Sequence, residues 1–179
     1  MFNNRVPTSE ELCDIEAIKQ LKAYYCRYAD SGQDAEAFAE LFTEDGVLDE
    51  GEDGIFEGRG AIVEMYRALW PHLRMNQHLV LNPLIEINGA SANGSWRLLQ
   101  FMTSINPEGD RAFIAAGYYD EQYVKVDGAW RFKHVCARVH FCCDAATGWA
   151  REPFAPVFSD AVLMALGLAP NPASDAVRK

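Results

Sequence analysis

Apolar residues recur at helical spacing near the start of the chain. The positions lie three or four apart, as on one face of an α-helix, and carry Leu12, Ile15, Ile18, Leu21 and Tyr25. Thr8 and Glu11 match the pattern of a capping box at the start of this segment. The pattern predicts a helix over residues 9–29, ended by Ser31 and Gly32.

The next segments are shorter and change period. A second helix is expected over residues 35–42, followed by a turn at residues 43–46. Residues 47–49 and 55–57 suit a small hairpin around a glycine-rich loop, and helical spacing returns over residues 61–69.

Beyond residue 76 the pattern alternates with a period of two. Four long strands are expected, over residues 77–88, 90–105, 111–126 and 130–142. Helices followed by a run of strands indicate an α+β fold, with the N-terminal helices packed on a strongly curved antiparallel sheet that forms a cone-shaped barrel. We expect a single domain over residues 1–179, with a core at about residues 9–142. The C-terminal extension over residues 143–179 should hold a short helix, within residues 159–168, and a loose tail.

Composition narrows the classes of function. The net charge is −10, and no cluster of Lys and Arg follows any segment, which argues against nucleic acid as a partner. The first residues lack the basic and apolar run of a signal peptide, and no apolar stretch reaches the about 20 residues that span a bilayer. We therefore expect a cytoplasmic protein without a membrane partner. Five cysteines without CxxC spacing favour buried thiols over disulfides or a zinc site.

Three residues are candidates for chemistry, although each has a plainer explanation. Tyr25 lies on the apolar face of the first helix, where a tyrosine usually packs in the core. Asp30 is about 140° away on the helical wheel, so both reach one cavity only if the helix ends near Asp30. His78 opens the first long strand, and a histidine there is more often a surface or hydrogen-bonded residue than a catalyst.

Several segments taken together resemble a known family. They occur in the right order over about residues 10–142 and read LKAYYCRYAD, LFTEDGVLD, FEGRGAI, LWP, QHLVLNPLIEINGASA and YVKVDGAWRFKH. This series resembles the SnoaL-like branch of the nuclear-transport-factor-2-like superfamily, which includes scytalone dehydratase, bile-acid 7α-dehydratase and hexachlorocyclohexane dehydrochlorinase. The resemblance implies a cone-shaped α+β barrel that holds a ligand.

The resemblance also implies a reaction. Asp30 and His78 match the acidic residue and the histidine of the family's catalytic pair, and Tyr25 matches a tyrosine five residues before that aspartate. We expect a lyase that works like a dehydratase without metal or organic cofactor, in which His78 is the base, Asp30 orients it, and Tyr25 donates a hydrogen bond to the developing charge. Two alternatives stay open: an isomerase of the ketosteroid type, and a domain that binds small molecules or oligomerises without catalysis.

The expected ligand is a hydrophobic cyclic molecule. We expect the pocket that holds it to be lined by Tyr66, Trp70, Phe101, Tyr119 and Phe141. A homo-oligomer, either a trimer or a dimer, is expected because an open curved sheet leaves an apolar outer face.

The sequence departs from these relatives in two places. The segment RAFIAAGYY lacks the second histidine of scytalone dehydratase, and Val135 stands where the dehydrochlorinase has an arginine. His134, Arg138 and His140 lie on the opposite face of the strand from Val135. We therefore expect them to contact neighbours or solvent rather than the pocket.

Overall fold

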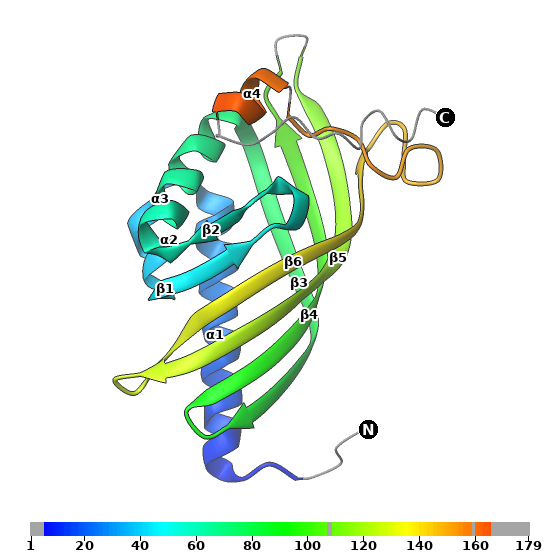
Figure 1. Cartoon of the computed structure of the whole chain (residues 1–179). Coiled ribbons are helices and arrows are strands. Elements are labelled where there is room, and N and C mark those ends of the chain that lie inside the picture. Colours follow the sequence, from blue (N-terminus) through cyan, green and yellow to red (C-terminus); the bar gives the residue numbers. More distant parts are fainter. Residues whose placement is uncertain (1–5, 107–108, 159, 166–179) are drawn as a thin grey trace.

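The computed structural model describes residues 6–106, 109–158 and 160–165 (Figure 1). The helices are α1 (Ser9–Ser31), α2 (Ala35–Glu40), α3 (Gly58–Leu69) and α4 (Asp160–Ala165), with short 3-10 turns η1 (Gly51–Asp53) and η2 (Trp70–His72). The strands are β1 (Phe42–Asp49), β2 (Ile55–Glu57), β3 (Leu73–Asn88), β4 (Ser91–Ser104), β5 (Arg111–Val126) and β6 (Ala129–Asp144).

The first helix begins and ends as the sequence predicts. The Thr8 hydroxyl accepts a hydrogen bond from the Glu11 backbone N–H at 3.2 Å, and the Glu11 carboxylate accepts one from the Thr8 N–H at 2.7 Å. At the other end Gly32 adopts φ 66° and donates its N–H to the Tyr28 carbonyl. The capping box and the left-handed glycine therefore place the last turn of α1, which carries Asp30, at a definite point.

One six-stranded sheet has the order β2-β1-β6-β5-β4-β3. The pairs β1–β2, β3–β4, β4–β5 and β5–β6 are antiparallel, whereas β1 runs parallel to β6. The chain reaches β6 only after the meander of β3 to β5, so no tight turn imposes an antiparallel arrangement on that pair. The expected α+β architecture is confirmed, with this parallel pair as a feature that the pattern did not indicate.

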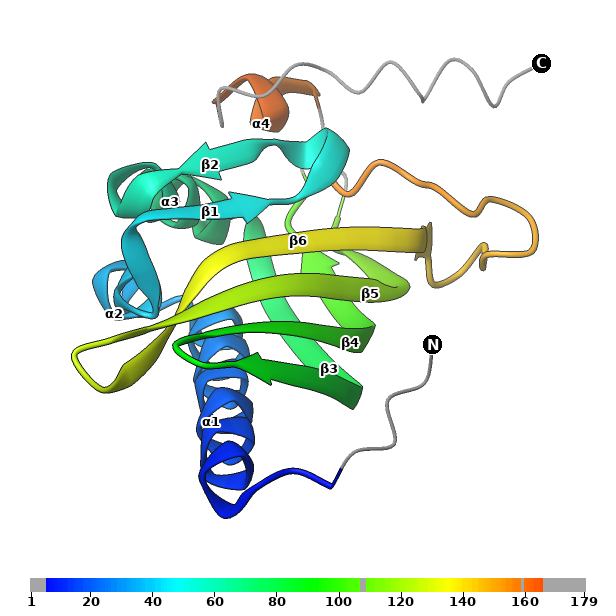
Figure 2. The same cartoon turned by 60° about the horizontal axis from the view of Figure 1, so that its bottom comes forward.

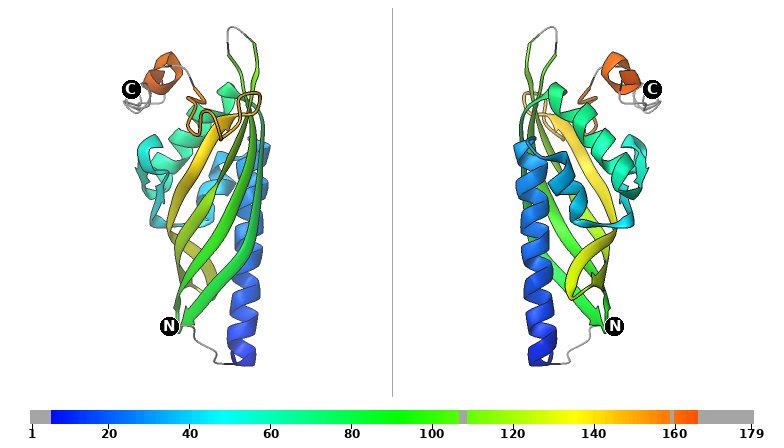
Figure 3. Two further views of the ribbon diagram at one scale, coloured as in Figure 1. Left: turned by 90° about the vertical axis from the view of Figure 1, so that its right-hand side faces the viewer. Right: turned by 90° about the vertical axis from the view of Figure 1, so that its left-hand side faces the viewer.

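The sheet curves around α1 (Figures 2 and 3). The β3–β4 register shifts between Leu81 and Leu84, where Asn82 has φ 50°, and the β5–β6 register shifts next to Gly117. Such bulges increase local twist and curvature. They curl the sheet into an open cone with α1 against its inner face.

Large side chains fill the narrow end of this cone. In the sheet, Trp96 pairs with Tyr119, and Tyr123 pairs with Phe132. All four side chains are buried and belong to one hydrophobic cluster with Ile18, Leu21 and Tyr25 of α1. Aromatic residues in these rows bury large apolar side chains against the helix.

The structure corrects the prediction for residues 35–46. Helix α2 ends at Glu40, and Phe42 already begins β1, because the buried Phe42 ring packs between Phe38 and Phe132. The residues expected as a turn lie inside β1, at a shift of its register with β6 between Phe42 and Val47. A bulge accommodates the polar residues there without ending the strand.

The C-terminal part extends the sheet before it reaches α4. Cys142 and Phe154 form a parallel bridge, and Ala155 donates its N–H to the Cys142 carbonyl at 2.8 Å. The expected short helix is present over residues 160–165 as α4, whereas residues 166–168 of its expected range and the predicted tail over residues 169–179 lie outside the described residues. Within the described ranges no helix is long and apolar enough to cross a membrane.

The five cysteines are free thiols. Cys26 and Cys143 are buried as expected, whereas Cys13 is exposed because it lies on the outer side of α1.

Candidate active site

The last turn of α1 brings a carboxylate to the edge strand of the sheet. Asp30 lies two residues before Gly32, and the indole of Trp70 packs so closely on Gly32 that an added Cβ would lie 2.3 Å from a ring atom. Only glycine fits there, since the position also needs the left-handed conformation. The packing of Trp70 fixes the end of the helix and the direction of Asp30.

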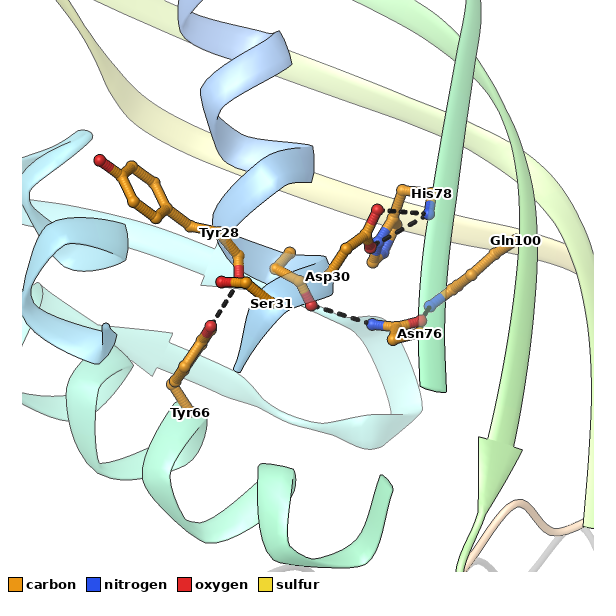
Figure 4. A network of polar contacts seen from close by, with 8 residues as sticks. Tyr28, Asp30, Ser31, Tyr66, Asn76, His78 and Gln100 are labelled. Carbon is orange, nitrogen blue, oxygen red and sulfur yellow. Dashed lines mark hydrogen bonds and ion pairs between the residues drawn. The ribbon is translucent and has the colours of Figure 1, made fainter. Parts of the chain in front are cut away.

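Asp30 binds His78 through two different groups (Figure 4). Its Oδ1 atom lies 2.6 Å from the Nδ1 atom of the imidazole, and its two carboxylate oxygens accept the His78 backbone N–H at 3.1 and 3.0 Å. The Asp30 side chain is 24% exposed and that of His78 is 8% exposed. A carboxylate at Nδ1 favours the tautomer with the proton on that atom, which leaves Nε2 free to accept a proton.

A second polar contact ties the same two elements together. The Asn76 amide donates to the Ala29 carbonyl at 3.2 Å and accepts from the Gln100 side chain at 2.8 Å (Figure 4). Asn76, His78 and Gln100 lie on one face of β3 and β4, since His78 and Gln100 are register partners. The edge strand β3 is thereby held to the end of α1, and the Asp30–His78 pair is positioned by rigid elements.

Tyr25 lies beside this pair within the aromatic core. Its ring centroid is 6.3 Å from that of His78 and 6.0 Å from that of Tyr119, and the side chain is almost fully buried. Burial raises the pKa of Tyr25 well above its usual value, so its hydroxyl is a neutral hydrogen-bond donor at physiological pH. The helix continues through Asp30, so Tyr25 and Asp30 approach His78 from different sides.

The sequence interpretation missed a buried ion pair below Tyr25. The Lys22 ammonium lies 2.5 Å from the Glu121 carboxylate, with both side chains fully buried, and 3.5 Å from the centroid of the Tyr119 ring. Tyr123 donates its hydroxyl to the same carboxylate and accepts from Trp96 Nε1 at 3.0 Å. The sequence did contain a signal for it. Glu121 lies two residues from both Tyr119 and Tyr123, so it shares their inner face of β5.

The five residues expected to line the pocket lie in different surroundings. Tyr119 is buried on the inner face, and Trp70 is partly buried against Gly32. The Tyr66 hydroxyl donates to the Tyr28 carbonyl, so this ring is part of the packing between the helices.

The prediction that Phe101 and Phe141 line the pocket is wrong. Phe101 alternates with the buried Leu98 and Trp96 of β4, and Phe141 pairs with Ala116, which alternates with the buried Tyr119. Both phenylalanines therefore lie on the outer face, where Phe141 stacks on Trp149. The bulge next to Gly117 shifts the alternation of β6, so the strand pattern alone did not show this.

Small side chains surround His78 at the wide end of the cone. The row of His78 and Gln100 continues into Ala115, and the next row contains Gly117 and Val139. Val139 is 43% exposed, which shows that the inner face is open at this level. Hollows of about 340 and 270 Å³ lie elsewhere on the surface and include none of Tyr25, Asp30 and His78. The floor below His78 is packed by the aromatic core around Tyr25.

The basic residues near the end of β6 contact neighbours, as expected. Arg138 donates to Asp49 with Nη1 at 3.0 Å and Nη2 at 2.7 Å, and these hydrogen bonds lower the pKa of Asp49 to about 2. His134 lies 3.9 Å from the same carboxylate, and His140 packs against Tyr118. In the described part of the chain, no group of three or more His, Cys, Asp and Glu side chains could hold a metal ion.

The curled sheet, the helix against its inner face and the polar pair at its mouth define a cone of the nuclear-transport-factor-2-like type. The chain belongs to the family of the SnoaL-like domain, whose model matches residues 10–136. None of the curated proteins compared with this chain matches it.

Solved structures share the fold. A candidate scytalone dehydratase from Novosphingobium aromaticivorans is 26% identical with a TM-score of 0.68, over 75% of this chain and 89% of that chain. A variant of Rv3472 from Mycobacterium tuberculosis, a protein of unknown function, is 27% identical with a TM-score of 0.66, over 92% and 91%. The hexachlorocyclohexane dehydrochlorinase LinA-type3 from Novosphingobium barchaimii is 22% identical with a TM-score of 0.68, over 76% and 92%.

Proposed function

We propose that this protein is a lyase that eliminates a leaving group from a hydrophobic cyclic small molecule without a cofactor. The observation that carries the proposal is the Asp30–His78 pair, with 2.6 Å between Oδ1 and Nδ1 and a further bond to the His78 main chain. The family membership and the likeness to a candidate scytalone dehydratase and to a dehydrochlorinase support an elimination.

In this mechanism His78 is the general base. Its Nε2 atom takes a proton from the carbon next to a carbonyl group, and the Asp30 carboxylate stabilises the imidazolium that forms. The Tyr25 hydroxyl donates to the carbonyl oxygen as negative charge develops there. The electron pair of the broken C–H bond then forms the double bond as the leaving group departs.

The alternative isomerase would use Asp30 as the base and leave His78 without a role. The geometry favours His78, because the Asp30 carboxylate already accepts hydrogen bonds from the imidazole and from a backbone N–H. Both oxygens of that carboxylate are engaged by these donors, which leaves the imidazole as the group able to face a substrate. A non-catalytic binding domain would need no such orienting carboxylate, so the pair also favours an enzyme.

The side chains next to His78 support an apolar substrate. Val80, Leu98 and Val139 are apolar and share one row on the inner face next to His78, and Val139 is exposed. Gly117 completes this row, and the main chain of β6 approaches it so closely that an added Cβ would lie 2.1 Å from the Arg138 carbonyl oxygen. A hydroxylated ring ketone suits an apolar surface that ends at a base and a hydrogen-bond donor.

The test is turnover of hydroxylated ring ketones, followed by the ultraviolet absorbance of the conjugated product. His78→Ala should lose activity by at least about 100-fold, and Asp30→Asn and Tyr25→Phe should each lose at least about tenfold. His140→Gln, which changes an exposed histidine, serves as the control. Full activity of His78→Ala contradicts the proposal. Full activity of His78→Ala, with loss in both Asp30→Asn and Tyr25→Phe, would point to the isomerase-like arrangement, in which Asp30 is the base and Tyr25 is the donor.

We also propose that a second copy of the chain covers the outer face of the sheet. The outer face of β3 to β6 carries the apolar side chains of Met75, Leu79, Leu81, Leu99, Phe101, Ile114, Ala116 and Phe141, with polar residues such as Gln77, Arg97 and Thr103 among them. Apolar side chains gathered on one face of a sheet favour association with a partner. Sedimentation should give a dimer or trimer, and Leu81→Glu with Phe101→Glu should give a monomer; a monomeric wild type contradicts the proposal.

A further inference from the structure

Two adjacent residues at the end of α1 hold the edge strand β3 at two positions. The Ala29 carbonyl accepts a hydrogen bond from the Asn76 amide at 3.2 Å. The Asp30 carboxylate binds the His78 ring, as described above (Figure 4). Asn76 and His78 are two residues apart on β3, so their side chains share the inner face. The contact of Asn76 continues to a third side chain, that of Gln100 on β4.

The hydrogen bonds of Asn76 fix the direction of the Gln100 amide. A backbone carbonyl can only accept, so the nitrogen of the Asn76 amide faces Ala29 and its oxygen faces Gln100. Gln100 therefore presents its own nitrogen, and Nε2 donates to Asn76 Oδ1 at 2.8 Å. Reversal of the Gln100 amide would place two oxygens in contact beside the buried Asn76. The oxygen atom Oε1 of Gln100 is thus turned away from this contact.

Two polar atoms on the inner face have no protein partner. Oε1 of Gln100 and Nε2 of His78 accept no hydrogen bond from any residue that the structure describes. Both side chains belong to partly buried residues. Over the same described ranges, the one buried side-chain nitrogen or oxygen without a hydrogen bond is Nε2 of His134. The free atoms of Gln100 and His78 are therefore not buried, and a molecule outside the protein can reach them.

The side chains that carry these two atoms are neighbours. His78 and Gln100 are register partners on β3 and β4. Partners of this kind have Cβ atoms about 4.5–5.5 Å apart on the same face of the sheet. A cyclic molecule with a carbon atom at Nε2 of His78 is consequently within reach of the Gln100 amide.

We propose that Gln100 sets the substrate specificity of the site by accepting a hydrogen bond from a hydroxyl group on the substrate ring. This assignment rests on the elimination proposed above. Oε1 can only accept, so it favours a ring hydroxyl, which donates, over an ether or an unsubstituted carbon. The bound hydroxyl is a second one and not the leaving group, because a departing oxygen needs a donor.

The contacts around Gln100 suit this role. Its amide is already held by Asn76, so a ligand does not have to immobilise a free side chain. The Asp30 carboxylate is not available for the same purpose, since the His78 ring and backbone engage both of its oxygens. Oε1 of Gln100 is therefore the acceptor next to His78 that remains for a substrate hydroxyl.

Binding of naphthol and of its methyl ether tests Gln100 without any turnover. Both probes are apolar rings without a leaving group, and only naphthol can donate a hydrogen bond. Calorimetric titration of the wild type should give a Kd about three- to tenfold lower for naphthol than for the ether. Gln100→Met, which keeps the length of the side chain, should bind the two probes equally.

Two further variants identify the acceptor. His78→Ala should keep the preference for naphthol, and so should the control Gln122→Met, which changes an exposed glutamine on β5. A preference that survives in Gln100→Met overturns the proposal, and its loss in His78→Ala would assign the acceptor to His78. A wild type that binds both probes equally, or binds neither, overturns the proposal without recourse to any variant.

Turnover gives a second readout. We would compare two cyclic β-hydroxy ketones that differ only in a further ring substituent, a hydroxyl or a methoxy group. The wild type should show a kcat/KM about three- to tenfold higher on the hydroxyl compound, and Gln100→Met should lose this difference. Equal kcat/KM values in the wild type overturn the role of Gln100, while an inactive His78→Ala keeps the proposed function. Full activity of His78→Ala on both ketones overturns the proposed function, and the naphthol titrations still decide whether Gln100 binds a hydroxyl.

Discussion

The Asp30 carboxylate holds His78 both by its ring and by its backbone, with Nδ1 at 2.6 Å and the N–H at 3.0 Å from a carboxylate oxygen. One side chain thus sets the orientation of the imidazole and also satisfies a backbone N–H on the edge strand β3. Edge strands otherwise present unpaired N–H groups. The contact has a structural and a proposed chemical role at the same place.

The structural role predicts a loss of stability in Asp30→Asn. An amide is a weaker acceptor than a carboxylate, so the free energy of unfolding should fall by about 1–3 kcal/mol. The His78 backbone amide should also exchange its hydrogen faster, as measured by exchange in deuterated water. Asp120→Asn, which changes an exposed aspartate on β5, should leave both measurements unchanged. Unchanged exchange at His78 in Asp30→Asn would contradict the described contact.

The buried Lys22–Glu121 pair predicts strong coupling between two substitutions. Lys22→Met leaves the Glu121 carboxylate buried without its partner and should lower the free energy of unfolding by about 3–5 kcal/mol. Adding Glu121→Gln should recover a large part of this loss, since the second charge is then gone. Denaturant unfolding of the single and double variants measures the coupling. Simple additivity of the two effects would show that the charges do not interact.

Asp49 predicts a stability term at acidic pH. The hydrogen bonds from Arg138 lower its pKa to about 2 in the folded chain, compared with about 3.9 in an unfolded one. The stabilisation is therefore present above pH 4 and is lost as the pH falls towards 2, and it amounts to about 1–2 kcal/mol because Arg138 is partly exposed. Asp49→Asn should be less stable than the wild type at pH 6, with the difference narrowing at pH 3.

Glu50 predicts a pH dependence of stability with the opposite sign, because its pKa is raised and not lowered. Its pKa of about 7 lies above the about 4.3 of an unfolded glutamate, so the folded state keeps a proton that the unfolded state has lost. Its contribution to stability is complete below pH 4 and is lost as the pH rises through 7. Glu50→Gln should therefore be more stable than the wild type by about 2–3 kcal/mol at pH 8 and unchanged at pH 4. Equal stability at both pH values would refute the raised pKa.

Gly32 and Gly89 offer a matched pair for the end of α1. Both have positive φ, at 66° and 61°, but an added Cβ meets Trp70 at Gly32 and nothing within 4 Å at Gly89. Gly89→Ala should cost only the backbone strain, about 1 kcal/mol, whereas Gly32→Ala should cost about 1–3 kcal/mol more. Thermal unfolding of the two variants isolates the packing of Trp70. Similar losses in both would contradict that packing.

The pattern of residues was sufficient for most of the elements. The capping box at Thr8 and Glu11 and the alternation of the long strands are local signals, and the structure follows them closely. The end of α2 was less predictable, because the Phe42 ring gains more by packing on Phe132 than by continuing the helix. Propensity gives way to tertiary packing at such a boundary.

The candidate site also contains residues that the sequence predicted and residues that it did not. Tyr25, Asp30 and His78 were predicted from the sequence and its family resemblance, and they lie together. Phe101 and Phe141 were assigned to the wrong face, and Lys22 and Glu121 were not considered. Charged residues normally lie on the surface, so a pattern gives little weight to a buried one until its partner is known.

By itself the sequence determined where the helices and strands form, since caps, glycines and apolar periods act within a few residues. Only the tertiary structure decided which carboxyl groups are held by donors, as those of Asp30 and Asp49 are, and which have a pKa raised by burial, as that of Glu50 has. Burial and the distance between charges set a carboxyl group's proton affinity, and both arise when segments far apart in the chain, such as α1, β1 and β3, come together.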